Sequence, residues 1–135
     1  AERYIITRSR GDESGDISGY DAMKALLKLQ PRPDGVFCYN DPMASGAMKA
    51  VLEAGYRIPD DIAIVGCGNV QYAPLLRVPL TSIDQNSASM GERAAKLALG
   101  LVGQKNQERA KIIFTEPTLV VRESSLKRNP TSSGQ

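Results

Sequence analysis

The chain has 135 residues, 41% of them hydrophobic, which is the size of one ordinary domain with enough apolar side chains for a core. Its 17 basic and 15 acidic residues give a net charge of +2 without a basic run, so composition gives no sign of direct nucleic-acid binding. The chain has no histidine, which excludes Ser–His and Cys–His nucleophile pairs and the usual zinc sites, and it has no apolar run of membrane-spanning length.

The first predicted elements are a strand and a helix separated by a polar loop. Tyr4–Thr7 is apolar and partly β-branched, which predicts a short strand, and Arg8–Ser18 is polar and contains glycines, which is typical of a surface loop. Gly19–Gln30 predicts an amphipathic helix that ends before Pro31. Because Ala1 is not a start methionine and a strand follows closely, we expect the native N-terminus to lie upstream.

A strand-to-helix turn comes next. Val36–Tyr39 is a short apolar run that predicts a buried strand. Asp41 suits the N-cap of a following helix, Pro42 suits its first position, and Gly55 ends it. Asn40 therefore lies between the carboxyl end of a strand and a helix, where ligands bind in open parallel α/β sheets. The alternative is that Asn40 only satisfies its own turn.

Two further apolar strands are predicted at Ile62–Gly66 and Leu80–Ile83. Polar or small residues follow each strand, Cys67-Gly68-Asn69 in the first case and Asp84-Gln85-Asn86 in the second. Strands that alternate with helices and are apolar throughout predict a parallel sheet covered on both faces. The residues after the strands are then expected at one edge of that sheet.

The last predicted helix begins near Ser87 or Ser89, either of which can cap it, and ends at Gly103. Its apolar positions include a stripe of four residues, Met90, Ala94, Leu97 and Leu101.

The C-terminal region is predicted to hold two strand pieces, Ile112–Phe114 and Leu119–Val121. Pro117 lies between them and confines the region to an edge or a bend. Residues 129–135 form a polar tail that we expect to be disordered.

Three features could carry chemistry, and a structural interpretation is favoured for each. Cys38 and Cys67 could form a redox pair or a metal site, but their apolar contexts favour two buried thiols. Asp60-Asp61 could be a pair of catalytic carboxylates, but it follows a proline in a turn, which favours a solvated loop. Gly66-Cys67-Gly68 lacks the continuation of a dinucleotide fingerprint. We therefore expect no enzyme, no cofactor and no metal site.

Four motifs are specific enough to identify a resemblance. They are SGYDAM (Ser18–Met23), the long run Pro33–Gly66, PLTSIDQ (Pro79–Gln85) and TLVVRES (Thr118–Ser124). In order and spacing they resemble the effector-binding core of bacterial transcription regulators of the lactose-repressor/galactose-repressor type. The resemblance implies an α/β fold, a parallel-sheet three-layer sandwich of the periplasmic-binding-protein-like kind, here incomplete.

The family pattern also implies how the chain is divided. Residues 1–86 match the C-terminal effector-binding subdomain and 105–126 its returning strands, and 127–135 are a disordered tail. Residues 87–104 match a helix that the intact fold places in the N-terminal subdomain. That subdomain, the DNA-binding headpiece, and the first strand and helix of the C-terminal subdomain are expected upstream of this sequence.

The effector site is implied residue by residue. Asn40 and Asp41 match the polar strand-end positions of the pocket, and Gln85 matches the crossover between subdomains. Ser14 stands where many members carry an aromatic ring, and Gly68 where many carry an aspartate, with Asn69 next to it. Because the ring and the carboxylate are both missing, the effector class stays open, and Ser14 and Gly68 are equally explained as loop residues.

The resemblance also implies a homodimer. The expected contact surface combines the outer face of one helix with a later segment, and its residues are Ser45, Lys49, Tyr72, Leu75 and Leu76. The stripe of residues 90–101 would lack its natural partner here, so we expect that helix to pack on a second copy, to be swapped, or to be repositioned on its own chain.

The function implied is that of an effector-sensing and dimerising fragment of a cytoplasmic DNA-binding regulator. It would bind a small molecule, sugar-like by the family pattern, between two subdomains, and operator DNA only through the missing headpiece, with no membrane contact. The alternative is a periplasmic solute-binding protein of a sugar transporter, which shares the fold.

Overall fold

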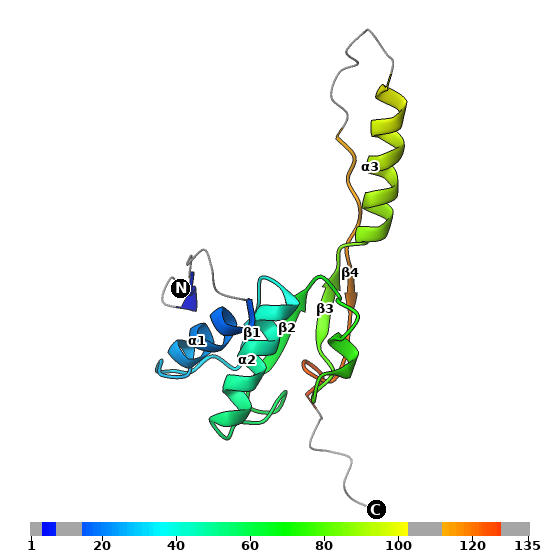
Figure 1. Cartoon of the computed structure of the whole chain (residues 1–135). Helices are drawn as coiled ribbons and strands as arrows, with labels where there is room; N and C mark the ends of the chain where they lie inside the picture. Colours follow the sequence, from blue (N-terminus) through cyan, green and yellow to red (C-terminus); the bar gives the residue numbers. More distant parts are fainter. Residues whose placement is uncertain (1–3, 8–14, 103–111, 128–135) are drawn as a thin grey trace, which may run out of the picture.

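A four-stranded sheet organises the molecule. The structure is a computed structural model that describes residues 4–7, 15–102 and 112–127. Its elements are α1 (Gly15–Leu26), β1 (Gly35–Phe37), α2 (Asp41–Glu53), β2 (Ala63–Cys67), the 3-10 helix η2 (Ala73–Leu75), β3 (Thr81–Asp84), α3 (Ser87–Leu101) and β4 (Thr118–Val120). The sheet order is β1-β2-β3-β4, with β1, β2 and β3 parallel and β4 antiparallel to β3 (Figure 1). The predicted α/β class with a parallel sheet is confirmed.

The hydrophobic core lies between the sheet and the helix pair α1 and α2. Ile64 on β2 and Val51 on α2 are fully buried in it, and Met23 joins them from α1. The two helices approach closely where Gly46 faces the backbone of Asp16, since a Cβ on Gly46 would collide with the Asp16 carbonyl oxygen. This close approach explains why a glycine stands in the middle of α2.

A buried carboxylate joins α2 to the sheet. Asp41, the first residue of α2, is fully buried, and its Oδ1 accepts a 2.6 Å hydrogen bond from the Ser82 hydroxyl on β3. Its Oδ2 accepts a 2.8 Å bond from the Val70 N–H, beyond β2. Gly66 on β2 lies against this carboxylate, and a Cβ there would collide with Oδ1. One side chain thus holds α2, β3 and the loop after β2 together.

The segment after β4 is fastened across the sheet by hydroxyl groups. Ser124 is fully buried, donates from Oγ to the Ile64 carbonyl at 2.6 Å and accepts from the Thr81 N–H at 2.8 Å. The Thr81 hydroxyl in turn accepts from the Arg122 N–H at 2.7 Å. Arg122 and Ser124, from the segment after β4, are therefore bound into the fold, consistent with an edge position for β4.

The N-terminal expectations were partly wrong. Tyr4–Thr7 forms no strand, and within the described segments the outer edge of β1 is unpaired. The Tyr4 hydroxyl instead donates to the Pro31 carbonyl at 3.0 Å. The predicted loop Arg8–Ser18 is helical from Gly15, and its residues 8–14 lie outside the described part. The predicted helix Gly19–Gln30 already ends at Leu26.

The shift of α1 has a physical reason. Asp16 lies in the first turn of α1, where the helix dipole favours a negative charge. The helix therefore begins at Gly15, within the polar stretch that was predicted to be a loop. Beyond Leu26 the chain tightens, with the Leu29 N–H bonded to the Leu26 carbonyl at 3.1 Å, which ends the helix before Pro31.

Both predicted helix caps were wrong by a residue or more. The N-cap of α2 is Asn40, whose Oδ1 accepts from the Met43 N–H at 2.9 Å, because the Asp41 carboxylate turns into the core; Pro42 is accordingly the second helical residue. The N-cap of α3 is Asn86 and not Ser87 or Ser89.

The predicted end of α2 and the bounds of two predicted strands agree with the structure to within one residue. Gly55, with φ of 80°, follows the end of α2 as predicted. The strands predicted at Ile62–Gly66 and Leu80–Ile83 are β2 and β3, each shifted by one residue towards the C-terminus. Gly103 and residues 129–135 lie outside the described part of the chain.

The C-terminal region contains one strand of the predicted two. Ile112–Phe114 is extended chain without a strand partner, whereas Leu119 and Val120 belong to β4. β4 is the last strand of the sheet, so the edge position expected from Pro117 is confirmed.

One face of the sheet is left largely uncovered. Phe37 is 62% exposed, Tyr39 is exposed as well, and the strand register places Leu119 on the same face as Phe37. The prediction of a buried strand at Val36–Tyr39 and of cover on both faces was therefore wrong for the described residues. The reason is that α1 and α2 pack together on the opposite face, and the third layer of the sandwich stays a prediction.

α3 projects away from the sheet (Figure 1). None of its side chains is buried, and Leu97 and Leu101 of the apolar stripe are exposed. The expectation that this helix is repositioned against its own chain was wrong for the described part, because its exit from β3 at Asn86 directs it outward.

We predict that Gly66→Ala destabilises the protein by about 2 kcal/mol, because the added methyl group displaces the Asp41 carboxylate from a packed site. Urea unfolding followed by circular dichroism measures this. Gly35→Ala is the matched control, since its Cβ would approach other atoms only to 4.0 Å and should change stability by less than about 0.5 kcal/mol. Equal effects of the two substitutions would contradict the importance of this contact.

Candidate functional site

The carboxyl ends of three adjacent parallel strands form the candidate site. The register pairs Phe37 with Val65 and Cys67 with Ile83, so β1, β2 and β3 end at the same edge. Each is followed by a predicted site residue, Asn40, Gly68 with Asn69, and Gln85, respectively. The predicted convergence of strand ends is therefore confirmed as geometry.

Asn40 fits both interpretations that its sequence position left open. Its Oδ1 caps α2 through the Met43 N–H, which satisfies the turn. Its side chain is only half-buried, and its Nδ2 donates to no other described residue. The amide group therefore offers a hydrogen-bond donor at the edge while its oxygen is used by the helix.

Asp41 has a different place from the one predicted. Its carboxylate is fully buried and both of its oxygens accept hydrogen bonds, from Ser82 and Val70. A group enclosed in this way touches no ligand directly in this conformation. Asp41 therefore stabilises the strand-end edge through internal hydrogen bonds.

The loop after β2 is committed to internal contacts. Gly68 has φ of 122°, a conformation that favours glycine, and its N–H bonds the Ile83 carbonyl at 2.8 Å. The side chain of Asn69 accepts from Arg122 Nη2 at 2.8 Å and donates to Asp84 Oδ2 at 2.9 Å. Gln85 is exposed and has no hydrogen bond to another described residue, and Ser14 lies outside the described residues.

The hydrogen bond from Asn69 has an electrostatic consequence. It lowers the pKa of Asp84, and a second bond from the Asn86 N–H, at 2.7 Å, acts in the same direction. Asp84 is therefore held as an ionised acceptor at the end of β3.

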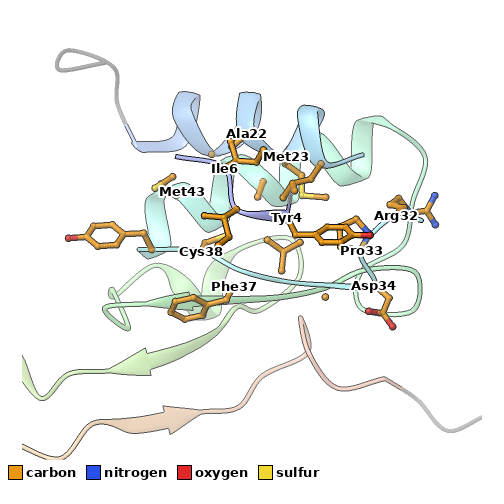
Figure 2. A pocket seen from close by; sticks show the side chains of 17 residues that line it. Tyr4, Ile6, Ala22, Met23, Arg32, Pro33, Asp34, Phe37, Cys38 and Met43 are labelled. Carbon is orange, nitrogen blue, oxygen red and sulfur yellow. The ribbon is translucent and has the colours of Figure 1, made fainter. Parts of the chain in front are cut away.

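A large apolar cavity lies beside β1, between this strand and α1. It has a volume of about 720 Å³ and lies between α1, β1 and the segment that contains Tyr4 and Ile6; Figure 2 shows Ala22 and Met23 above that segment and Phe37 below it. None of the predicted effector residues that the structure describes lines it, although Tyr39 and Met43, on either side of Asn40 and Asp41, do. The cavity therefore adjoins the strand-end edge at β1 without including its predicted residues.

The Cys38 thiol, which lines this cavity, is unreactive. Burial raises the pKa of Cys38 to about 12, and the nearby Asp41 charge adds to this, so the thiol stays protonated. Cys67 is half-buried, and both cysteines are free. The interpretation of two structural thiols holds fully for Cys38.

The predicted dimer residues lie around one groove and one helix turn. Ser45, Lys49 and Leu76 line a groove of about 360 Å³ beside α2. Tyr72 precedes η2 and Leu75 ends it; both are exposed, Leu75 by 82%. The structure thus presents these residues as an accessible surface, and their role in a dimer stays a prediction.

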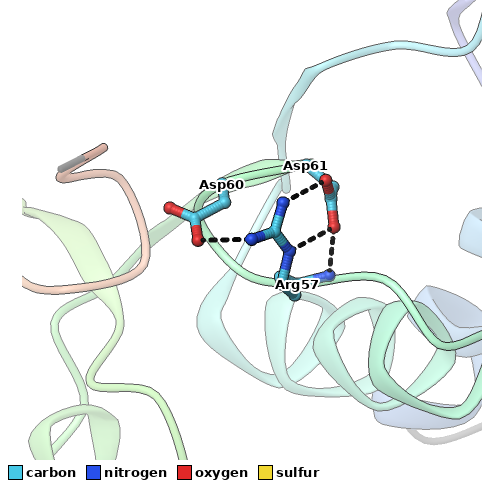
Figure 3. Close-up of polar contacts among 3 residues, drawn as sticks. All are labelled: Arg57, Asp60 and Asp61. Atoms are coloured by element: carbon cyan, nitrogen blue, oxygen red, sulfur yellow. Dashed lines mark hydrogen bonds and ion pairs between the residues drawn. The ribbon is translucent and has the colours of Figure 1, made fainter. Parts of the chain in front are cut away.

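The two adjacent carboxylates of the loop after α2 are held by one arginine (Figure 3). Arg57 Nη1 lies 3.3 Å from Asp60 Oδ2, while its Nη2 donates to Asp61 Oδ1 at 3.0 Å and its Nε to Asp61 Oδ2 at 3.1 Å. These bonds lower the pKa of Asp61 to about 2. Asp61, ionised and bound to arginine, cannot serve as a general acid, and the same arginine contacts Asp60, which favours the solvated-loop interpretation.

Sequence reasoning missed two residues that shape the site. Asp84 was noted only as part of a strand end and Arg122 only as part of a motif, yet both bind Asn69. A charged residue at a strand end next to Gln85 was the available signal for Asp84. Arg122 lies 53 residues from Asn69 in the chain, and no local pattern predicts that contact.

The described residues offer neither a metal-ligand cluster nor a membrane-spanning helix. Residues 4–7, 15–102 and 112–127 contain no group of three His, Cys, Asp or Glu side chains placed to hold a metal ion. Within the same ranges no helix has the length and apolar character that crossing a bilayer requires.

Comparison with known proteins places the chain among bacterial regulators. The profile of the family described as "Periplasmic binding protein-like domain" matches residues 2–125. A protein named HTH-type transcriptional repressor PurR, from Mannheimia succiniciproducens, is 44% identical over 109 residues, which cover 81% of this chain and 32% of that protein.

Solved structures agree with these sequences. A LacI family transcriptional regulator from Lactobacillus casei with bound sucrose is similar with a TM-score of 0.70 and 31% identity, over 82% of this chain and 40% of that one. A transcriptional regulator CelR in complex with cellobiose has a TM-score of 0.76 and 34% identity, over 87% and 35%. The chain therefore spans about a third of the length of the curated relatives that it matches.

We predict that the Arg57–Asp61 contact makes stability depend on pH in the acid range. Because the pKa of Asp61 falls from 3.8 to about 2 on folding, its stabilising effect is present above about pH 4 and is lost as the pH falls towards 2. Asp61→Asn should therefore melt below the unmodified protein at neutral pH, with the difference vanishing near pH 2. Thermal denaturation at several pH values measures this.

Asp34→Asn is the control for that experiment. The Asp34 carboxylate is exposed and lies 3.9 Å from Lys127 Nζ, without a closer hydrogen bond, so its removal should leave the melting temperature nearly unchanged at every pH. A pH-independent difference for Asp61→Asn would contradict the electrostatic explanation.

Proposed function

We propose that this chain, which belongs to the periplasmic-binding-protein-like family of lactose-repressor-type transcription regulators, is the effector-sensing and dimerising part of a bacterial DNA-binding regulator. The observation that carries the proposal is the strand-end edge. Three parallel strands deliver Asn40, Asn69 and Gln85 to it, and the chain leaves this edge at once as the exposed helix α3. That is the arrangement of one half of a clamp.

In this proposal α3 belongs to the other half. Residues 87–104 cross to an N-terminal subdomain that covers the apolar stripe around Leu97 and Leu101, and 105–126 return to the sheet. The lack of any buried side chain on α3 supports this, because an apolar stripe of this size is covered in a stable monomer. Second-copy packing and swapping of the isolated chain remain alternatives to test.

The cavity beside β1 supports an incomplete subdomain. β1 ends the sheet with an unpaired edge among the described residues, and the cavity of about 720 Å³ next to it is lined by apolar groups such as Ile6, Met23 and Val36. We assign this space, and the uncovered face at Phe37, to the first strand and helix of the subdomain. In this proposal both lie within the two thirds of the relatives' length that this sequence does not match.

The mechanism is a shift between two closure states. An effector that touches both subdomains favours one closure angle, and this changes the spacing of paired headpieces on operator DNA. The shift is limited to the effector's difference in affinity for the two states. This chain alone carries one side of the effector site, so it should bind neither effector nor operator tightly.

The proposed effector is a polar, sugar-like molecule. The solved relatives named above hold sucrose and cellobiose. In this chain the Asn40 amide and the exposed Gln85 supply groups that pair with hydroxyls, while position 68 is a glycine and adds no carboxylate. The protein would act in the cytoplasm, where operator DNA is found.

The complete gene product tests this function against the solute-binding alternative. Purified protein is mixed with fragmented genomic DNA, with and without a panel of mono- and disaccharides, and the bound fragments are sequenced. Enrichment of two-fold symmetric sites that responds to one sugar is the expected result. A cleaved secretory leader together with sugar binding and no enriched DNA would instead establish the periplasmic alternative.

We predict that Asn40→Asp in the complete protein weakens binding of its sugar effector about tenfold, because the Nδ2 donor is lost while an oxygen remains to cap α2. Isothermal calorimetry measures the affinity and thermal denaturation shows that the fold is kept. Gln85→Glu is the companion variant and should weaken binding similarly. Unchanged affinity in both variants would place the effector elsewhere.

We predict that Leu75→Asp raises the dissociation constant of the dimer at least about tenfold, because a leucine side chain leaves the contact and a charge enters it. Light scattering over a concentration series measures this. Leu126→Asp is the control, since Leu126 is also exposed but follows β4 and is not part of the predicted contact surface, so it should change nothing. A monomer at every concentration before substitution would remove this surface from the proposal.

A further inference from the structure

Asn69 stands at the centre of a set of hydrogen bonds between three segments. Its side-chain oxygen accepts from Arg122 Nη2, its amide nitrogen donates to Asp84 Oδ2 at 2.9 Å, and its backbone N–H donates to the Ser82 hydroxyl at 3.0 Å. These partners lie on the segment after β4, at the end of β3, and within β3. Both ends of the amide are thus used inside the protein.

Asp84 carries this contact to the point where the chain leaves the sheet. It is the last residue of β3, and while Oδ2 accepts from Asn69, Oδ1 accepts from the Asn86 N–H at 2.7 Å. Asn86 is the N-cap of α3, and its carbonyl accepts the Met90 N–H at 3.0 Å. The direction in which α3 departs is therefore set by a residue that Asp84 holds.

Backbone conformation singles out the same two asparagines. In the described residues, Asn69 with φ of 47° and Asn86 with φ of 56° are the non-glycine residues in the left-handed region. Such conformations persist where the surroundings enforce them, and they collect at functional turns. Here both asparagines bind the Asp84 carboxylate, Asn69 at Oδ2 and Asn86 at Oδ1.

Arg122 completes the arrangement on the returning chain. Besides its bond to Asn69, its Nη1 donates to the Leu80 carbonyl at 2.7 Å and its N–H to Thr81 Oγ1. The guanidinium is thus also bound to the residue before β3, while the Arg122 backbone is bound to the first residue of β3. The outgoing and returning segments, already paired as β3 and β4, are thus joined once more through the Asn69 amide.

We infer that Asn69 is a hinge-positioning residue and not an effector ligand: its amide joins Asp84 and Arg122 and so fixes the turn at Asn86 from which α3 leaves. This role of Asn69 matters for closure only if the proposed function is correct, so the inference rests on that function. It differs from the expectation that Asn69 contacts the effector. Contact with a ligand at this edge then falls to Asn40 and Gln85.

The experiment exchanges donor and acceptor within the pair. In Asn69→Asp the carboxylate still accepts from Arg122 but repels Asp84, whereas adding Asp84→Asn restores one donor facing one acceptor. The amide-exchange rate of Asn86, measured by NMR on this chain, reports the hinge, and that of Ile64, bonded to the Ser124 carbonyl, reports the core.

We expect Asn69→Asp to accelerate exchange at Asn86 about tenfold, the double variant to return it to within about threefold of the original rate, and Ile64 to be unaffected in both. Unchanged exchange at Asn86 in the single variant, or no recovery in the double variant, would overturn the inference. Equal acceleration at Ile64 would also overturn it, because a general loss of stability would then explain the result. All of these outcomes are independent of DNA and effector binding, so failure of the proposed function is distinguishable.

Discussion

The fold depends on the compensation of one buried charge. A carboxylate removed from water without partners is strongly destabilising, and Asp41 avoids this by accepting from the Ser82 hydroxyl and the Val70 N–H while lying at the positive end of α2. Those bonds can form only if α2, β3 and the loop after β2 are in register, and only if position 66 has no side chain. The strand-end edge takes its shape from this requirement.

The polar residues at that edge fall into two groups with different tasks. Asp41, Asn69 and Asp84 are satisfied by partners within the protein, and together they connect the first turn of α2 to the exit of α3. Asn40 and Gln85 keep hydrogen-bonding capacity towards solvent. A regulator of this kind needs both groups, since a ligand must be recognised and its presence must be transmitted to a moving part.

Local patterns in the sequence predicted the class of fold and the edge, because apolar strands followed by polar turns depend on neighbours in the chain. The same patterns failed where a distant residue decides the outcome. Asp41 looked like a cap and is a core residue, since Ser82 lies 41 positions away. Asn69 looked like a ligand contact, since neither Asp84 nor Arg122 is near it in the sequence. Phe37 looked buried, because an apolar strand does not reveal whether its second face has a cover.

Among the residues that the structure describes, the outer edge of β1 is unpaired, and this has a consequence for the isolated polypeptide. Unpaired N–H and C=O groups beside exposed apolar side chains such as Phe37 form a template on which another extended chain can pair. The charged and proline residues that commonly protect such an edge are absent from Gly35–Phe37 itself. An unprotected edge of this kind makes the isolated polypeptide prone to edge-to-edge aggregation, in which β1 of one molecule pairs with an extended segment of another.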